Sequence, residues 1–354
     1  MQTLNATVGR IAAPDPAARA AAHARLECLT MPHWALGRLM DLAEDLAGMT
    51  GSPRPAVQRK TIVTMAGDHG VTAEGVSKYP PEVTPQMVHN FVHGGAGINA
   101  LSRLVGARVV VVDMGVAGDL SALDKAGKIV SKRIAPGTKN MARGPAMSRD
   151  EAVRCVEAGI DIALQLGPGT DVFGTGDMGI GNTTPSSAIV AVLSGAPVVT
   201  VTGCGTGISE KERLHKIEVI QKALALNKPD PKDALDVLAK VGGFEIGGIA
   251  GLILGAAAQR KPVVLDGFIS TAGALLANTL APKSAAYMIA AHRSVEQGHR
   301  LALELLNKRP LLDLDLRLGE GTGAALAMNL LEAAVRVLTE VATFEEAAVS
   351  EAKQ

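Results

Sequence analysis

Short β-branched apolar segments recur along this chain, and longer segments with helical patterning separate them. The strongest of these segments are residues 60–66, 108–113, 170–173, 198–202 and 262–266, and a weaker one is 128–134. Short apolar runs of this kind are typical of buried strands. Strands that alternate with helices form parallel sheets covered by helices on both faces. We therefore predict an α/β fold whose ligands bind beyond the carboxyl ends of the strands.

Cap residues mark the expected starts of four helices. A capping side chain just before a proline, or a serine three residues before a glutamate, is typical of a helix N-terminus. The four signals are Asp15 before Pro16, Thr84 before Pro85, Ser148 with Glu151, and Ser209 with Glu212. A further helix is expected over residues 32–47.

The two ends of the chain carry helical patterning without further strand signals. After Met288 the pattern is helical almost throughout, apart from a connector over residues 311–318. We therefore predict that residues 1–58 and 305–354 form a small helical lobe. This lobe is expected to pack beside a sheet domain of residues 59–304, which binds the substrates.

The composition excludes several classes of partner. Lys and Arg together number 35, as do Asp and Glu, and no long run of one charge occurs. This balance argues against a surface for nucleic acid or anionic membranes. Aromatic residues make up only 2%, which further weakens a base-stacking platform. Small molecules are the expected partners.

Cysteine usage and hydropathy indicate a soluble cytoplasmic protein. The cysteines Cys28, Cys155 and Cys204 are far apart and have no metal-ligand spacing, so we expect reduced thiols. No signal peptide is expected, because the first 25 residues lack an apolar core segment. The uncharged run 188–208 contains Pro197 and four glycines, which favours several short elements over one membrane-spanning helix.

Two glycine-rich turns follow predicted strands that are consecutive in the sequence. The first, over residues 173–184, follows the strand 170–173, and the second, over 202–207, follows the strand 198–202. A strand, a glycine loop and a helix start present backbone N–H groups to a phosphate. Neither turn matches the GxxxxGK[ST] P-loop pattern. The alternative is a pair of tight turns without a ligand, and their succession favours a nucleotide site.

A third glycine-rich turn, RLGEGTGA at residues 317–324, places one carboxylate among three glycines. Because glycine permits close backbone approach, Glu320 can be directed toward a ligand. The alternative is a solvated glutamate where a loop enters a helix. Together with the two upstream turns, this segment is expected to form a wall of one site.

A cluster of titratable residues late in the chain raises a metal hypothesis. His292, Glu296 and His299 have near-helical spacing, and His292 and Glu296 at i and i+4 would share a helix face. The HExxH register is absent, and the sequence identifies no further ligand. Hydrogen-bonded histidines near the site are therefore favoured over a metal site. Tyr79, in the proline-rich loop 77–87, is either a wall of an aromatic pocket or a surface residue.

Six motifs together identify a family. They are AGDHGV (66–71), YPPEVTPQM (79–87), GGAGIN (94–99), GDMGIGNTT (176–184), HRSVEQGH (292–299) and RLGEGTGA (317–324). Through them the chain resembles the nicotinate-nucleotide–dimethylbenzimidazole phosphoribosyltransferases, which prepare the lower-ligand nucleotide of cobalamin. The resemblance implies a Rossmann-like parallel sheet domain, a small helical lobe from both termini, and a homodimer. It also implies transfer of phosphoribose from nicotinate mononucleotide to 5,6-dimethylbenzimidazole, giving α-ribazole 5′-phosphate and nicotinate, without a metal or cofactor.

The resemblance also implies roles for particular residues. Glu320 matches the catalytic base, and Asp177 stands where the family usually has a second catalytic carboxylate, a longer Glu. Tyr79 and Gln86 match residues that line the benzimidazole pocket. Relatives often carry arginine at the position of Cys204. The expected substrate-binding residues are Tyr79, Gln86, Gly176, Met178, Gly179, Ile180, Gly181, Asn182, Thr183, Gly203, Gly205, Lys216 and Leu318.

Physical chemistry supports Glu320 as the base. The nicotinate of the mononucleotide is a cationic pyridinium, so it leaves without a general acid, and the attacking benzimidazole must lose a proton. One rival is a dinucleotide-dependent oxidoreductase, which needs an acidic residue at the end of the next strand, and residues 202–203 provide none. The other rival is a non-catalytic regulator that binds the mononucleotide without turnover.

Overall fold

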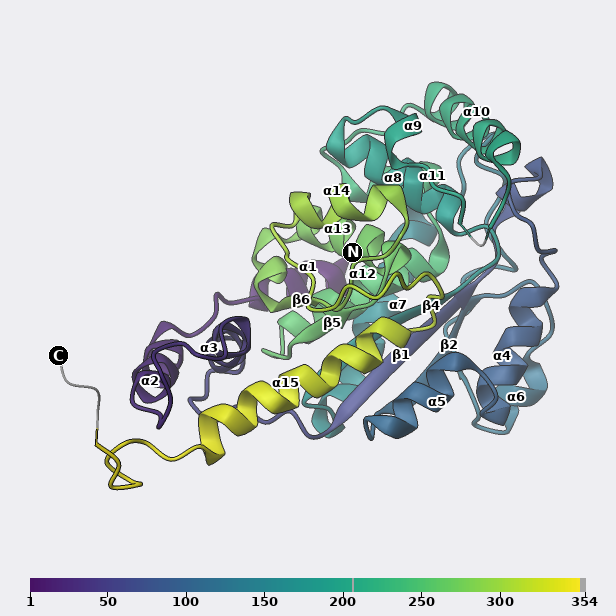
Figure 1. Cartoon of the computed structure of the whole chain (residues 1–354). Helices are drawn as coiled ribbons and strands as arrows, with labels where there is room; N and C mark the ends of the chain where they lie inside the picture. The colour runs from purple at the N-terminus through teal and green to yellow at the C-terminus, as the bar shows by residue number, and fades with distance from the viewer. Residues whose placement is uncertain (206, 351–354) are drawn as a thin grey trace.

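The computed structural model of the chain describes residues 1–205 and 207–350 and contains one six-stranded sheet (Figure 1). Every neighbouring pair of strands is parallel, in the order β3-β2-β1-β4-β5-β6. The strands are β1 (Lys60–Gly67), β2 (Arg108–Gly115), β3 (Val130–Ser131), β4 (Val172–Met178), β5 (Val263–Leu265) and β6 (Met288–Ala290). The predicted α/β class with a parallel sheet is confirmed.

The strand order reverses direction between β1 and β4. Strands added after β1 run outward on one side as β2 and β3, and those from β4 onward run outward on the other. Loops leaving the carboxyl ends of β1 and β4 therefore diverge, which opens a crevice at this switch point. Gly67 ends β1, and Met178 ends β4. The glycine turn after β4 thus lies where ligands of such sheets bind.

Helices precede, connect and follow the strands. They are α1 (Gln2–Arg10), α2 (Pro16–Glu27), α3 (Arg38–Thr50), α4 (Val83–His93), α5 (Gly97–Leu104), α6 (Ser121–Lys125), α7 (Arg149–Leu166), α8 (Thr183–Ser194), α9 (Val198–Val201), α10 (Glu210–Asn227), α11 (Ala234–Val241), α12 (Phe244–Ala257), α13 (Phe268–Leu280), α14 (Gln297–Leu305) and α15 (Thr322–Glu340), with short 3₁₀ helices η1 (Gly70–Glu74), η2 (Gly167–Gly169) and η3 (Pro282–Tyr287). The caps predicted at Asp15, Ser148 and Ser209 are confirmed, since each side chain accepts a backbone N–H of the first turn.

The two faces of the sheet are covered by different helices. On β1, the side chain of Ile62 lies against Gly321 at the start of α15, while Met65 lies against Gly248 of α12. Successive side chains of a strand point to opposite faces, so α15 and α12 cover opposite sides. Figure 1 shows α15 lying along β1. The RLGEGTGA turn (317–324), which leads into α15, therefore lies on one face of the sheet.

Glycines let α7 and α12 cross at very short range. A Cβ on Gly159 of α7 would lie 1.9 Å from the carbonyl oxygen of Gly248, and one on Gly251 of α12 would lie 1.9 Å from that of Val156. Only glycine permits backbones to approach this closely. Part of the high glycine content therefore serves helix packing rather than ligand binding.

Helices from both ends of the chain meet beside the sheet. The helices α2 and α3 pack against α15, and the bridge between Leu29 and Thr343 joins the two terminal segments (Figure 1). The first helix behaves differently, because α1 packs against α7 and the amino group of Met1 bonds to Glu157. The domain bounds 1–58, 59–304 and 305–354 stay a prediction.

The strand predicted at residues 198–202 is wrong, because this segment forms the single helical turn α9. Pro197 sits at its N-cap, and the Thr202 hydroxyl donates to the carbonyl of Val198. Its β-branched sequence fits a buried surface of either type. The place beside β4 is taken by β5, and α9 packs instead against α8, α10 and α14.

Three further boundaries differ from the prediction. Thr84 is not a cap, since α4 starts at Val83 with Glu82 as its N-cap. The helix predicted over 32–47 runs from Arg38 to Thr50, and the strand predicted over 128–134 shrinks to two residues. The edge strand β6 was not expected. Throughout residues 1–205 and 207–350, no helix is long and apolar enough to cross a membrane.

Candidate active site

The loop between β4 and α8 depends on its glycines. A Cβ on Gly179 would lie 2.3 Å from the carbonyl oxygen of Gly67 at the end of β1. Gly181 has a φ of +87°, which L side chains rarely adopt. The backbone N–H of Ile180 donates to the hydroxyl of Thr84, at 3.1 Å. The loop is thereby held between β1 and α4 with its backbone close to the crevice.

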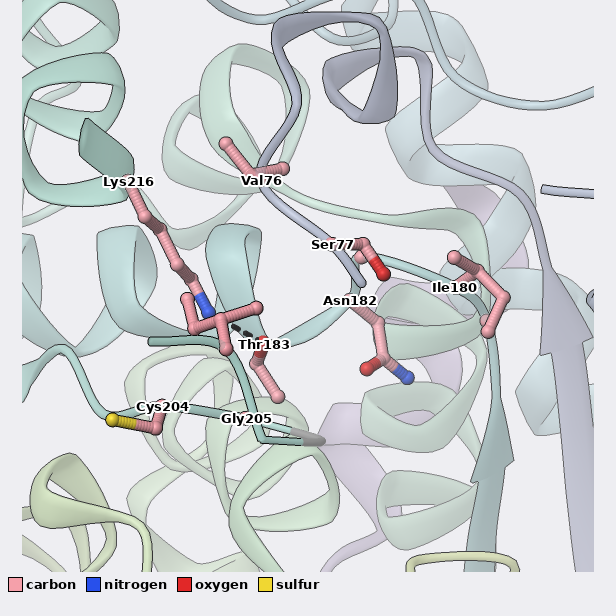
Figure 2. A pocket seen from close by; sticks show the side chains of 11 residues that line it. Val76, Ser77, Ile180, Asn182, Thr183, Cys204, Gly205 and Lys216 are labelled. Carbon is pink, nitrogen blue, oxygen red and sulfur yellow. Dashed lines mark hydrogen bonds between the residues drawn. The ribbon is translucent and has the colours of Figure 1, made fainter. Parts of the chain in front are cut away.

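A small cavity opens over this loop (Figure 2). Its lining consists of Val76, Ser77, Gly179, Ile180, Gly181, Asn182, Thr183, Cys204, Gly205, Ile208 and Lys216. The ammonium group of Lys216, on the buried side of α10, donates to the Thr183 hydroxyl at 2.6 Å. Burial lowers the pKa of Lys216 to about 8, and the attraction of Glu296 opposes this shift. The positively charged ammonium group of Lys216 thus lines the first cavity beside the N-terminus of α8.

A second cavity adjoins the first. It is lined by Asp177, Asn182, Thr183, Gly205, Gly267, Phe268, Ile269, His292, Ser294, Glu296, Arg317, Leu318 and Gly319. Three of these residues, Asn182, Thr183 and Gly205, also line the first cavity. The two cavities therefore form neighbouring parts of one site.

The turn that carries Glu320 is pinned to the central strands. The carbonyl oxygen of Glu320 accepts a hydrogen bond from the Thr64 hydroxyl at 2.9 Å, and the backbone N–H of Glu320 donates to the carbonyl of Asp177 at 3.2 Å. The Glu320 carboxylate is buried and accepts the N–H of Ile98, at 3.0 Å, at the start of α5. Burial raises the pKa of Glu320. A carboxylate with a raised pKa is suited to act as a general base near neutral pH.

Two more buried carboxyl groups flank this turn. Asp266, just after β5, accepts the N–H groups of Gly321, Gly323 and Ala324 at 3.0, 2.6 and 3.1 Å, and so caps α15. Burial raises the pKa of Asp177 well above its ordinary value, and the Asp266 charge adds to the shift. Like charges that share a low-dielectric site favour one protonated member.

Comparison with known proteins identifies the family. The sequence profile of a family described as phosphoribosyltransferase matches residues 11–349. A protein of Syntrophotalea carbinolica is 67% identical over 353 residues, with 100% of each chain covered, and one of Desulfotalea psychrophila is 58% identical over 351 residues, with 99% of each covered. Both are named nicotinate-nucleotide–dimethylbenzimidazole phosphoribosyltransferase. The chain belongs to this family. The resemblance inferred from the six motifs is confirmed.

A solved structure of a member of the nicotinate-nucleotide–dimethylbenzimidazole phosphoribosyltransferase family, from Thermus thermophilus, has the same fold. The two chains superpose with a TM-score of 0.90 at 46% identity, covering 96% of this chain and 100% of the other. The overall architecture described above is therefore that of the family.

Most of the residues expected to bind substrate line the two cavities. Those that do are Gly179, Ile180, Gly181, Asn182, Thr183, Gly205, Lys216 and Leu318. Asp177, which was expected to be catalytic, also lines the second cavity. Two others act behind the lining: a Cβ on Gly176 would lie 2.4 Å from the carbonyl oxygen of Glu320, and one on Gly203 would lie 2.4 Å from the carboxylate of Glu296. Gly176 and Gly203 therefore make room for these two acids. Thr206 of the second turn lies outside the described residues.

The remaining residues that the family resemblance points to lie outside the cavity linings. Tyr79 is 46% exposed in the loop before α4, and Gln86 is exposed on α4. Met178 is half-buried at the end of β4. The Glu320 carboxylate bonds to the backbone of α5 and is not part of either cavity lining. Leu318 and Gly319, which precede it in the same turn, do line the second cavity.

The helical face predicted for His292 and Glu296 is wrong, since α14 begins only at Gln297. His292 instead continues β6 and pairs with Leu312. His299 accepts the N–H of Ser294 at Nδ1 and contacts the Thr271 hydroxyl at Nε2, at 2.9 and 3.0 Å. Burial lowers the pKa of His299 to about 3, so the ring is neutral. In the described ranges, no three His, Cys, Asp or Glu residues are placed to hold a metal ion.

Sequence reasoning missed several site residues of this family member. Asp266 is a buried acid at the end of a predicted strand, a position that can be recognised from sequence. Glu296 and His292 were not predicted to bind substrate, although they belong to the HRSVEQGH motif, and both line the second cavity. Arg317 carries no local signal beyond its place before the Glu320 turn.

Proposed function

We propose that the chain transfers the phosphoribosyl group of nicotinate mononucleotide to 5,6-dimethylbenzimidazole, releasing nicotinate and forming α-ribazole 5′-phosphate for cobalamin assembly. The observation that carries this proposal is the pair of adjoining cavities at the β1/β4 switch point. The first suits a phosphate and the second suits a ribosyl group with its base. The names of the relatives specify the two substrates.

The phosphate of the mononucleotide fits the first cavity. The glycine loop and the N-terminus of α8 offer backbone N–H groups and a positive dipole end. Lys216 adds a buried cation beside Thr183. Because Lys216 is buried, its attraction for a phosphate is stronger than that of a surface lysine. The phosphate thereby fixes the ribose at the junction of the cavities.

The transfer needs one base and no acid. The bond between the ribose and the pyridinium nitrogen breaks with its electron pair going to that nitrogen, which leaves nicotinate as a neutral ring. One benzimidazole nitrogen forms the new bond to the ribose from the opposite face, so that a β-linkage becomes an α-linkage. The proton on the other benzimidazole nitrogen passes to Glu320. Buried carboxyl groups nearby stabilise the positive charge that develops on the ribose.

We further propose that the enzyme acts in the cytoplasm as a homodimer. The cysteines Cys28, Cys155 and Cys204 are all free thiols, as expected of a reducing compartment. Tyr79 and Leu318 expose apolar side chains beside the site, and a second subunit would cover such groups. Sedimentation equilibrium gives the mass, and a monomer at assay concentrations contradicts this assembly.

Product analysis tests the reaction directly. Pure protein is incubated with nicotinate mononucleotide and a panel of benzimidazoles, purines and phenols, and the products are separated and weighed by mass spectrometry. We expect an α-linked ribotide with one nicotinate released per product. Mononucleotide binding without turnover would favour the regulator, and NAD binding with hydride transfer would favour the oxidoreductase.

The pH dependence of substrate capture tests the role of Lys216. Because burial lowers the pKa of Lys216 to about 8 in the protein without substrate, the positive charge of Lys216 is lost as the pH rises through that value. We expect kcat/KM for nicotinate mononucleotide to fall about tenfold per pH unit above this pKa. Nicotinate riboside, which lacks the phosphate, is the matched substrate and shows no such fall. If the Lys216→Met variant keeps the alkaline fall, another group causes it.

A further inference from the structure

Glu296 is a buried acid at the wall of the second cavity, and one of its oxygens is unused. The residue is 8% exposed, and Oε2 has no hydrogen-bond partner among the described residues. The loop opposite is shaped around this carboxylate, because a Cβ on Gly203 would lie 2.4 Å from Oε2. Burial raises the pKa of this carboxyl group, and the Lys216 charge and the nearby backbone N–H of Gly205 oppose the shift. Because buried carboxylate oxygens in proteins are normally hydrogen-bonded, the unpaired oxygen of Glu296 is suited to accept a hydrogen bond from a ligand.

The charge of Glu296 faces that of Lys216 across the junction of the cavities. Lys216 donates to Thr183, and its interaction with Glu296 is a longer-range attraction without a hydrogen bond. Burying two opposite charges without contact is costly, since neither compensates the other fully. A ligand that offers an anion to the lysine and hydroxyl donors to the glutamate would satisfy both. A ribose 5-phosphate has this pattern.

Two other buried atoms at the second cavity also lack a hydrogen-bond partner within residues 1–205 and 207–350. They are Oδ1 of Asp177 and Nδ1 of His292. With Glu296, they supply several unpaired polar atoms around one space, which suits the vicinal hydroxyls of a ribose better than an apolar ring. Phe268, Ile269 and Leu318 provide the apolar part of the same lining.

We infer that Glu296 accepts a hydrogen bond from a ribose hydroxyl of the mononucleotide and thereby selects ribosyl over deoxyribosyl donors. This inference rests on the proposed function and adds a specificity residue to it. A hydroxyl on the ribose becomes a better donor as the ring gains positive charge, so the bond strengthens in the transition state. Glu296 therefore contributes to kcat as well as to binding.

The competing role for Glu296 is purely structural, namely to position Lys216. The two roles differ in which part of the substrate matters. A ribose contact depends on a hydroxyl of the sugar, whereas positioning of Lys216 depends on the phosphate. Substrates that lack one or the other therefore separate the two roles.

The test combines the Glu296→Gln variant with four substrates: nicotinate mononucleotide, its 2′-deoxy and 3′-deoxy analogues, and nicotinate riboside. We expect one deoxy analogue to lose about 10-fold to 100-fold in kcat/KM with the wild type. The variant loses a similar factor with the normal substrate and loses little more with that analogue. Glu304→Gln, on the exposed side of α14, is the matched control and behaves as wild type.

Two outcomes of this comparison overturn the inference. The first is that the losses in kcat/KM caused by Glu296→Gln and by each deoxy analogue multiply independently. The second is that the effect of Glu296→Gln disappears with nicotinate riboside. If Glu296→Gln does not fold, as judged by circular dichroism, Glu296→Asp replaces it in the same comparison.

If the wild type turns over no mononucleotide, the proposed function fails. Calorimetric titration with ribose 5-phosphate and 2-deoxyribose 5-phosphate then tests the contact, and equal affinities overturn it.

Discussion

Replacing Glu320 with Gln is expected to lower kcat by about 10²–10⁴-fold, the range that a positioned general base contributes. Gln keeps the size of the side chain, and its amide oxygen still accepts the N–H of Ile98. The backbone at position 320 has a φ of +64° in either case, so the turn is not additionally strained. Steady-state kinetics with both substrates measures the effect, and substrate binding is expected to persist.

The pH profile makes the assignment of Glu320 specific. Burial raises the pKa of this carboxyl, and only the ionised form accepts a proton. Wild-type kcat is therefore expected to fall as the pH drops through the raised pKa, and Glu320→Gln removes this acidic limb. Glu340→Gln, at the far end of α15, serves as the control and keeps it. Wild-type turnover by Glu320→Gln would show that another group takes the proton.

Asp266→Ala is expected to destabilise the fold by about 3 kcal/mol or more. The substitution leaves the N–H groups of Gly321, Gly323 and Ala324 buried without an acceptor. Each orphaned donor costs about 1–3 kcal/mol, and the burial cost of the carboxylate, which is relieved, offsets part of the sum. The midpoint of urea unfolding measures the loss, and activity is expected to fall because the Glu320 turn loses its anchor.

The matched control for Asp266 is Asp15, which also caps a helix with its side chain. Asp15 accepts the N–H groups of Ala17 and Ala18 at the exposed start of α2. Asp15→Ala is expected to cost only about 1 kcal/mol, as exposed caps do. Similar losses at both positions would mean that burial adds nothing to the cap at Asp266.

Local patterns predicted the α/β class and the glycine turn after β4. Short apolar runs gave β1, β2, β4 and β5 their approximate places, because each is buried on both faces and needs only apolar residues. The motif resemblance added Lys216 and Thr183, whose contact across 33 residues no local pattern contains.

Non-local contacts decided the features that the sequence did not predict. Residues 198–201 became helical because β5 occupies the place beside β4. His292 lies on an extended segment because Leu312, 20 residues later, pairs with it. The hydroxyl of Thr84 bonds to Ile180 instead of capping its own helix. Side-chain patterns constrain burial, whereas the partner that fills each position depends on the whole topology.

The turn before α15 depends on segments that are far apart in the sequence. The Glu320 turn is held by Ile98, Thr64, Asp177 and Asp266, which all lie earlier in the chain. Two of these partners lie in β1 and β4, so Glu320 takes its place only where the two central strands are formed. Local opening of these strands would release the turn at the same time. The position of Glu320 and the integrity of the central sheet are thus coupled.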